Sequence, residues 1–263
     1  MSYSIVCLEK KGYIEAMNPQ ETLSGILLVD KPAGWTSHDI VAKMRGVLGI
    51  KRIGHAGTLD PFATGLVILG INKGTKNLEK LMHETKVYET TIFLGATSTT
   101  FDTEGEITPT EPTTAKPPAP THAGVLNVPT LEEIEEALNQ FRGGYEQKAP
   151  LFSAKHIRGK RLYDLAREGK ATEEMRPSKL VRIDEIKTLN YSYPKLTLKI
   201  TCGSGTYIRS IADDLGHALG IGGYCLTLRR LSIGHYQAEQ AVTPLDDREH
   251  ILEKLLPINE IEP

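Results

Sequence analysis

The sequence predicts a globular protein in which helices and strands are mixed. Short apolar runs typical of strands alternate along the chain with segments whose apolar residues recur at helical intervals. The 263 residues can bury a substantial core, as one large domain or two small ones. No apolar run approaches the roughly 20 residues of a membrane-spanning helix, and residues 5–8 lack the basic flank of a secretory signal. We therefore expect a soluble, cytoplasmic protein.

Periodicity and turn signals divide the chain into elements. Apolar or alternating runs predict strands at residues 25–29, 66–69, 86–94, 180–186 and 196–200. Helical spacing predicts helices at residues 36–48 and 75–82, from residue 131 onward, after a glycine turn at residue 203 through Leu219, and at 245–256. Residues 1–24 show no sustained periodicity, and we expect an extension there without an assigned role.

Side-chain signals mark several of these boundaries. Thr36 and Asp39 have the spacing of a capping box at the start of the first helix, and Gly49 is a natural stop for it. A similar cap at Thr130 starts the later helix, which ends at two glycines. The apolar residues expected to share one side of that helix are Leu131, Ile134, Leu138 and Phe141.

Three further patterns concern packing. In the strand at residues 86–94, alternate side chains face opposite sides, so Tyr88 and Leu94 share a face. Six prolines between residues 107 and 130 exclude a helix or a central strand and predict an extended surface loop. The cysteines lie far apart without a Cys-x-x-Cys pair, so we expect buried thiols rather than disulfides or a zinc site at Cys7, Cys202 and Cys225.

Charge is distributed unevenly along the chain. The formal net charge of −2 argues against a uniformly basic nucleic-acid binder. Residues 142–182, however, contain eleven Lys or Arg against five Asp or Glu, and residues 40–55 contain four Lys or Arg and no acid. Four glutamates within residues 132–136 form an ordinary solvated face. The two basic segments are therefore the candidates for contacts with a polyanion.

One acidic residue, Asp60, lies between glycine-rich backbone and the predicted strand at residues 66–69. The residue before a proline is pushed away from the helical region, so Asp60 should lie on an extended or turning segment. The glycines that let the backbone bend nearby are Gly54, Gly57 and Gly65. Asp-Pro is a common turn pair, which by itself favours a structural role. A carboxylate on a rigid turn that follows the basic residues Lys51 and Arg52 also suits chemistry on a polyanion.

The stretch from His55 to Leu66, His-Ala-Gly-Thr-Leu-Asp-Pro-Phe-Ala-Thr-Gly-Leu, resembles the catalytic motif of the TruB family of tRNA pseudouridine-55 synthases. The likeness extends from about residue 25 to about residue 236. Further segments that resemble the family in the same order are residues 31–37, 86–95, 205–216 and 228–234. The resemblance implies an α+β fold with a mixed, largely antiparallel sheet, flanking helices and a central catalytic cleft.

The resemblance also implies a set of site residues. It makes Asp60 the catalytic residue, with Arg209 beside it to favour the charged carboxylate. Tyr88 would pack against the target base, Tyr207 would line the pocket and Leu228 would support the base from its apolar side. His55 would fill the space that the extruded uridine vacates or contact the displaced loop. The residues implied to bind substrate are Lys31, His55, Tyr88, Tyr207, Arg209 and Leu228.

From the residues alone, each of these side chains has a structural alternative. Tyr88 could be a core aromatic, His55 a satisfied structural histidine and Arg209 a solvated helix residue. We favour the site roles because of the resemblance. It also implies an RNA partner, the T-arm stem-loop of tRNA, bound by a monomer with no obligate protein partner and no membrane.

The implied reaction converts uridine to pseudouridine. It breaks the C1′–N1 bond, turns the uracil and rejoins it through C5. No cofactor or metal is required, which agrees with the absence of metal-ligand spacing among the eight histidines and three cysteines. Asp60 would act as nucleophile or as base at the sugar, and the sequence leaves both routes open.

The resemblance divides the chain into an extension at residues 1–24, a catalytic domain at 25–245 and a short helix and tail at 246–263, without a complete PUA domain. Within the catalytic domain, residues 148–182 resemble the mobile thumb that closes over the RNA. Lys and Arg in this segment can neutralise phosphates. Phe152 stands where many members have tyrosine, which removes one hydroxyl.

Two other functions stay open from the residues. A glycosidase would pair Asp60 with a second carboxylate, for which the candidates are Asp30, Asp39 and Asp102. The single tryptophan, Trp35, offers little as a sugar platform. A non-catalytic RNA-binding or RNA-folding protein would use the basic segments and leave Asp60 unneeded. Release of free base would indicate the first, and function without Asp60 the second.

Overall fold

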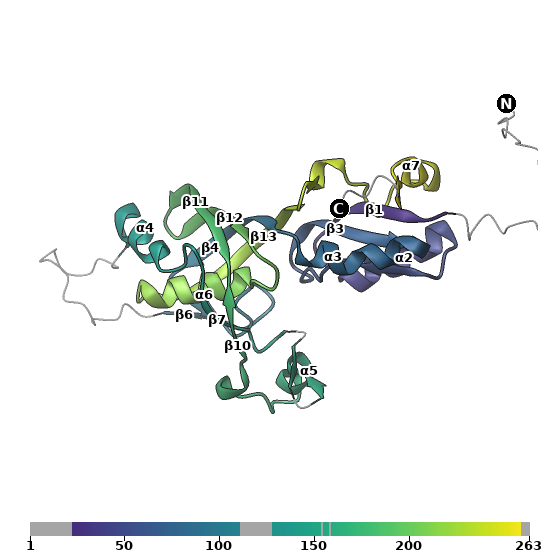
Figure 1. Cartoon of the computed structure of the whole chain (residues 1–263). Coiled ribbons are helices and arrows are strands. Elements are labelled where there is room, and N and C mark those ends of the chain that lie inside the picture. Colours follow the sequence, from purple (N-terminus) through teal and green to yellow (C-terminus); the bar gives the residue numbers. More distant parts are fainter. Residues whose placement is uncertain (1–22, 111–127, 154, 158, 259–263) are drawn as a thin grey trace, which may run out of the picture.

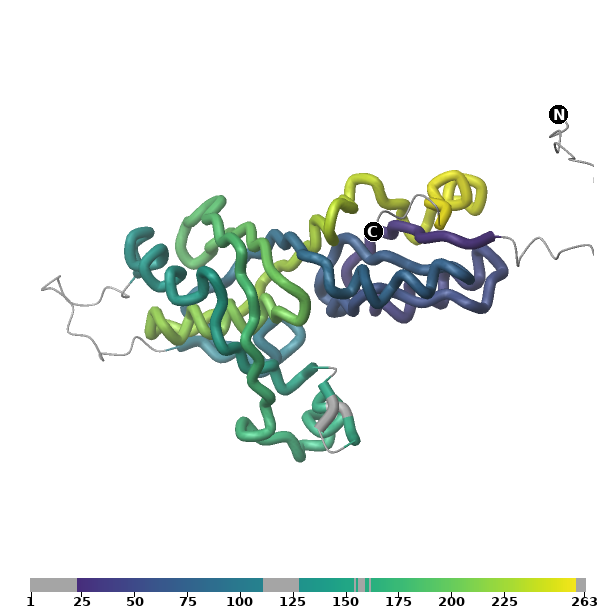
Figure 2. Tube along the Cα trace, viewed as in Figure 1, coloured from purple at the N-terminus to yellow at the C-terminus, as the bar shows by residue number. Residues whose placement is uncertain are grey.

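The computed structural model describes residues 23–110, 128–153, 155–157 and 159–258 (Figure 1). Most of the predicted N-terminal extension, Cys7 and most of the proline-rich segment lie outside these ranges. The described residues form two halves that lie side by side, each built from strands and helices (Figure 2). A smaller lobe around α5 (Leu162–Arg167) projects from one of the halves.

One nine-stranded sheet runs through both halves of the described structure. Its central order is β11-β12-β4-β13-β3-β1-β15, with β2 beside β3 and β14 beside β13. Every pairing is antiparallel except that of β13 with β3, which confirms the predicted α+β fold with a mixed, largely antiparallel sheet. The bounds are β1 Gly25–Lys31, β2 Ile53–His55, β3 Thr64–Ile71, β4 Lys86–Leu94, β11 Ile183–Ser192, β12 Lys195–Cys202, β13 Gly223–Ile233, β14 Tyr236–Gln237 and β15 Leu256–Pro257.

The two halves meet at a seam where β13 and β3 pair through only two residue pairs, Thr64 with Arg229 and Gly65 with Arg230. The backbones approach closely here, because a Cβ atom on Gly65 would lie 2.3 Å from the Arg230 carbonyl oxygen. Gly65 also has a φ of +103°, so only glycine fits at this position. The loop of residues 56–63, which leads into β3, therefore lies at the seam.

Helices cover both faces of the sheet. Residues of α2, α4 and α6 share one apolar cluster with Leu27 and Val29 of β1, whereas Ile26 and Leu28 pack with α3 in a second cluster. Because successive residues of a strand point to opposite faces, the two clusters lie on opposite sides of the sheet. The helix bounds are α2 Ser37–Leu48, α3 Leu78–His83, α4 Leu131–Asn139, α6 Ile208–Ala218 and α7 Arg248–Glu253, and the 3-10 turns are η1 Asn72–Asn77, η2 Glu173–Met175 and η3 Ala238–Gln240.

Both predicted helix caps are present. Thr36 forms a capping box with Asp39 at the start of α2, and Thr130 forms one with Glu133 at the start of α4. Leu131 was expected on the buried side of α4 but is 45% exposed. It is the first residue of the helix, and the buried stripe begins one turn later at Ile134.

Two helices are shorter than the sequence predicted. The helix expected at residues 75–82 is a 3-10 turn, η1, followed by α3. The helix expected at residues 245–256 is confined to α7, and Leu245 is 77% exposed. The chain after α7 forms β15, which pairs with β1 at the edge of the sheet. The C-terminal segment therefore completes the sheet as well as forming a helix.

The segment that resembles a thumb leaves the main body through a ribbon of two strands, β7 (Tyr145–Lys148) and β10 (Ser178–Val181). Beyond the ribbon lie β8 (His156–Ile157), β9 (Lys160–Arg161), α5 and η2 (Figure 1). A second ribbon pairs β5 (Ala96–Ser98) with β6 (Ile107–Pro109).

The remaining predictions concern cysteines and membrane spans. Cys202 and Cys225 are free and buried, as predicted. Along the described ranges, the helices are too short or too polar to cross a bilayer.

Candidate active site

The loop before β3 holds Asp60 on a fixed corner at the seam. The Gly34 N–H donates to the Pro61 carbonyl at 2.8 Å, and the Leu59 N–H donates to the Ser37 hydroxyl at 2.9 Å. The backbone on both sides of Asp60 is thus tied to the turn and helix that follow β1. The Asp60 side chain is 33% exposed, so another molecule can reach it.

Lys31 lies behind this corner and not at its surface. Its side chain is fully buried, and its ammonium donates to the carbonyls of Pro32 at 2.9 Å, Trp35 at 2.7 Å and Pro61 at 3.1 Å. Burial lowers its pKa to about 8, so it still carries a charge at neutral pH. The Lys31 ammonium therefore lies behind the Asp60 corner and fixes its backbone.

Arg230 supports the same loop from β13. The residue is 2% exposed, and its Nε donates to the Leu66 carbonyl at 2.7 Å. Its two terminal nitrogens reach the carbonyls of Thr58 at 3.5 Å and Gly57 at 3.4 Å. Two buried cations therefore hold the loop around Asp60, one from each half of the sheet. The Lys31 ammonium also interacts electrostatically with the Asp60 carboxylate.

We expect Lys31→Met to lower both stability and catalytic rate. The change leaves three carbonyls without a buried donor, which should lower the free energy of unfolding by about 2–4 kcal/mol. Denaturant unfolding measures this loss. Among folded molecules kcat should also fall, because the Asp60 corner loses its anchor.

Lys86→Met is the matched control for this prediction. The Lys86 ammonium is likewise buried and donates to three carbonyls, but these belong to the C-terminal end of α3 and the residues after it. We expect a similar loss of stability with kcat unchanged, measured at a temperature where both variants are folded. Equal kcat losses in the two variants would contradict the role given to Lys31.

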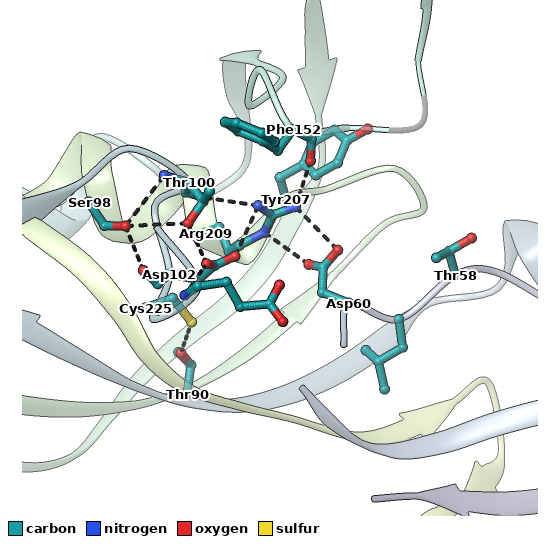
Figure 3. Close-up of polar contacts among 12 residues, drawn as sticks. Thr58, Asp60, Thr90, Ser98, Thr100, Asp102, Phe152, Tyr207, Arg209 and Cys225 are labelled. Atoms are coloured by element: carbon teal, nitrogen blue, oxygen red, sulfur yellow. Dashed lines mark hydrogen bonds and ion pairs between the residues drawn. The ribbon is translucent and has the colours of Figure 1, made fainter. Parts of the chain in front are cut away.

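Arg209, near the start of α6, makes the central contacts of the site (Figure 3). Its Nε lies 2.9 Å from Oδ2 of Asp60, and its Nη2 donates to Oδ1 of Asp60 at 3.2 Å. On its other side, Nη1 lies 3.1 Å from Oδ2 of Asp102 and donates to the Thr100 carbonyl at 2.9 Å. Nη2 also donates to the Phe152 carbonyl at 3.2 Å. The guanidinium is 4% exposed. It holds Asp60 side-on, with Nε and Nη2 each facing one carboxylate oxygen.

Sequence reasoning did not place Asp102 in this site and considered it only as a glycosidase carboxylate. Asp102 is 2% exposed and follows Phe101, which has a φ of +64°. Left-handed backbone is strained for a bulky residue, so the surrounding contacts must hold this turn in place. The Ser98 hydroxyl donates to the Asp102 carbonyl at 2.6 Å, and the Cys225 N–H donates to the Phe101 carbonyl at 2.9 Å. The turn thereby presents Asp102 to Arg209.

Tyr207 precedes α6 and lies beside Arg209 in Figure 3. Burial raises the pKa of its phenol, so the side chain is neutral at physiological pH. Its backbone is held by the Gln147 side chain, with the Tyr207 N–H donating to Oε1 at 2.7 Å. Tyr207 and Arg209, two residues apart, thus meet Asp60, which lies 149 positions before Arg209 in the sequence, at the seam.

Tyr88 and Leu228 lie on neighbouring strands of the sheet. The register of β4 with β13 places Tyr88 opposite Arg230 and Thr90 opposite Leu228, so these side chains share one face. Both predicted residues belong to the apolar cluster that also contains Ile208 of α6. Burial raises the pKa of the Tyr88 phenol and keeps it neutral. They therefore lie in the sheet beneath the helix that carries Arg209.

His55 ends β2 and starts the Asp60 loop. Its ring meets that of His38 edge-on, with 5.3 Å between the ring centroids. Burial, together with the charges of His38 and Arg230, lowers the pKa of the His55 imidazole. The ring is therefore neutral at physiological pH and is suited to stacking or to filling an apolar space.

The other carboxylates proposed as partners of Asp60 in a glycosidase are engaged elsewhere. Asp30 receives two hydrogen bonds from Arg229, at 3.0 Å and 2.7 Å. Asp39 caps α2, and Asp102 is buried against Arg209. Among the residues that the structure describes, no three His, Cys, Asp or Glu side chains are arranged to hold a metal ion. Asp60 is thus the accessible carboxylate that a buried guanidinium backs.

Sequence comparisons agree with the motifs. Residues 45–208 match the N-terminal domain of TruB family pseudouridylate synthases. The tRNA pseudouridine synthase B of Corynebacterium diphtheriae is 42% identical over 240 residues, which cover 89% of this chain and 76% of the relative. The tRNA pseudouridine synthase B of Chlamydia muridarum is 40% identical over 223 residues, which cover 84% of this chain and 86% of the relative.

Solved structures share the fold. A chain from a Cbf5–Nop10–Gar1 complex superposes with a TM-score of 0.67 at 23% identity, covering 95% of this chain and 65% of its own length. A chain from an H/ACA RNP bound to a substrate RNA containing 2′-deoxyuridine has a TM-score of 0.62 at 21% identity, covering 90% of this chain and 59% of its own length. This chain therefore spans less than two thirds of those structures, and the likeness concerns the fold.

Proposed function

The chain belongs to the TruB family of pseudouridylate synthases, and we propose that it converts uridine 55 in the T-arm loop of tRNA to pseudouridine. The observation that carries this proposal is the ion pair between the Asp60 carboxylate and the Arg209 guanidinium. One side of Asp60 is accessible, while the other is held by a guanidinium that is only 4% exposed. The pairing fixes the direction of the carboxylate before substrate arrives.

The isomerisation breaks the C1′–N1 bond of uridine and forms a C1′–C5 bond. The proton on C5 is lost and N1 gains one, so the product has the composition of the substrate. Asp60 supplies the carboxylate at the sugar, as the nucleophile at C1′ or as a base that removes a sugar proton. Both routes start from the ionised side chain, which Arg209 stabilises by its charge.

The detached uracil has to be held while it turns. We propose that Tyr207 and Tyr88 pack against the base and that Leu228 supports it from the apolar side. Extruding the uridine from a folded loop costs roughly a few kcal/mol of lost stacking and pairing. A neutral His55 ring, at the start of the Asp60 loop, is suited to offset part of this by filling the vacated space.

The thumb-like lobe is proposed to hold the RNA backbone. Exposed cations on it, including Lys155, Lys160 and Lys170, can pair with phosphates. Arg167 lies over the Tyr163 ring at 4.6 Å from its centroid, so the lobe also carries an aromatic surface. Binding that rests on phosphate contacts weakens as salt rises, and we expect affinity for the stem-loop to fall accordingly.

The test uses the full chain and a synthetic T-arm stem-loop with uridine at position 55. Pseudouridine-specific chemical labelling should find the product at that position, and a matched stem-loop with cytidine at position 55 should give no product. Pseudouridine elsewhere in the loop would contradict the assigned position. Binding without any product would favour the non-catalytic RNA-binding alternative, and release of free uracil would favour a glycosidase.

A further inference from the structure

Gln147, on β7, binds the backbone of Tyr207 through both the oxygen and the nitrogen of its side-chain amide. Its Oε1 accepts from the Tyr207 N–H at 2.7 Å, and its Nε2 donates to the Tyr207 carbonyl at 3.0 Å. The residue is 2% exposed. A buried side chain thus pairs with the N–H and the C=O of one residue, as a neighbouring strand would.

One of these contacts satisfies a backbone donor at the start of a helix. Tyr207 is the N-cap of α6, and its own side chain makes no capping hydrogen bond. Helix starts leave backbone donors without partners, and a missing cap typically loosens the first turn. That first turn carries Arg209. Nearby, the Ser210 hydroxyl donates to the Lys148 carbonyl at 3.0 Å, so β7 is joined to α6 at two successive points.

The orientation of the Gln147 amide is fixed by a third contact. Its Nε2 also donates to the Tyr145 hydroxyl at 2.7 Å, and that hydroxyl donates to Oδ2 of Asp214 at 2.8 Å. Burial raises the pKa of the Tyr145 phenol, so its proton stays in place. Each donor in this chain has one acceptor, and turning the amide over would break all of its contacts.

We propose that Gln147 is a positioning residue for the isomerisation: it sets the place of Tyr207 and of the α6 turn that carries Arg209. This inference rests on the proposed function, because it assigns a role within the same site. Gln147 makes its contacts to the Tyr207 backbone and not to Asp60. Because β7 also leads into the thumb-like lobe, these hydrogen bonds join the root of that lobe to the start of α6.

Gln147→Met tests the proposal by keeping the length of the side chain and removing its hydrogen bonds. A small displacement of catalytic groups lowers rates steeply, so we expect kcat on the uridine 55 stem-loop to fall about 10- to 100-fold. KM should change less than about threefold, because the RNA-contacting surface is left intact. Glu146→Met, at the exposed neighbour on the same strand, is the control and should leave both values unchanged.

Gln147→Glu gives a second readout that a purely structural role would not produce. The carboxylate can still accept from the Tyr207 N–H, but it faces the Tyr207 carbonyl without a proton to donate. Protonating it restores that contact, and burial favours the protonated form. We expect kcat of this variant, relative to the unchanged protein, to rise as pH falls from about 8 to about 6. Gln147→Met should show no such trend.

The outcomes separate this inference from the proposed function. Unchanged kcat in Gln147→Met, or a flat relative pH profile in Gln147→Glu, would overturn the role of Gln147 while pseudouridine formation by the unchanged protein still stood. A failure of the unchanged protein to form pseudouridine would instead overturn the proposed function. Thermal unfolding of each variant shows that the comparison is made on folded protein.

Discussion

The Asp60→Asn variant is expected to fold and to bind the T-arm stem-loop but to form no pseudouridine. Asparagine has the shape of aspartate and can keep the hydrogen bond from Arg209 to Oδ1. The neutral amide can neither attack C1′ nor take up a sugar proton. We therefore expect the single-turnover rate to fall by at least about 10³-fold, because removing a nucleophile or base eliminates the step it performs. Labelled pseudouridine measures the rate, and filter binding measures affinity.

Asp184→Asn provides the control for charge removal. Asp184 also lies beside an arginine, with Nε of Arg182 at 3.1 Å from its Oδ1, but the pair is on the exposed surface. Its amide variant should retain full activity and nearly full stability, as is usual for exposed pairs. Appreciable turnover by Asp60→Asn would rule out the catalytic role of that carboxylate. Loss of RNA binding in the same variant would show that Asp60 serves recognition instead.

Features set by local sequence could be predicted. The capping box of Thr36 with Asp39 depends on residues three apart, and it is present. The alternation in β4 placed Tyr88 and Leu94 on one buried face, which the structure confirms. The Asp60 corner also follows from its neighbours, because proline restricts the residue before it and glycine lets the backbone bend. These features depend on neighbouring residues in the sequence and not on the segments that pack against them.

Contacts between segments far apart in the sequence could not be predicted in the same way. Arg209 meets Asp102 and the Thr100 carbonyl through a turn more than a hundred residues earlier in the chain. The turn has glycine and polar signals in its sequence, but nothing there says which helix it faces. The surroundings of Lys31 could not be predicted either. Its motif placed it near the reaction, and the three carbonyls around its ammonium show that it supports the backbone there.

Arg209→Lys should lose both activity and stability, although the charge is kept. Lysine has a single ammonium and cannot hold Asp60 side-on while it also reaches Asp102 and two carbonyls. The Asp102 carboxylate, 2% exposed, would be left without its partner, which should lower the free energy of unfolding by about 3–5 kcal/mol. We expect a fall of about 10²-fold in the single-turnover rate, because Asp60 is no longer directed. Arg142→Lys, in the exposed pair with Glu135, should change neither quantity appreciably.

A double variant separates the two losses. Combining Arg209→Lys with Asp102→Asn removes the buried charge that the single change leaves unpaired. Stability should therefore largely recover, since a neutral amide is easier to bury than an ion. The rate should stay low, because lysine still cannot contact both carboxylate oxygens of Asp60 as the guanidinium does. Denaturant unfolding and single-turnover labelling on the same preparations measure the two effects. If the rate recovered together with stability, Arg209 would serve the fold alone, and the pairing on which the proposed mechanism rests would be dispensable.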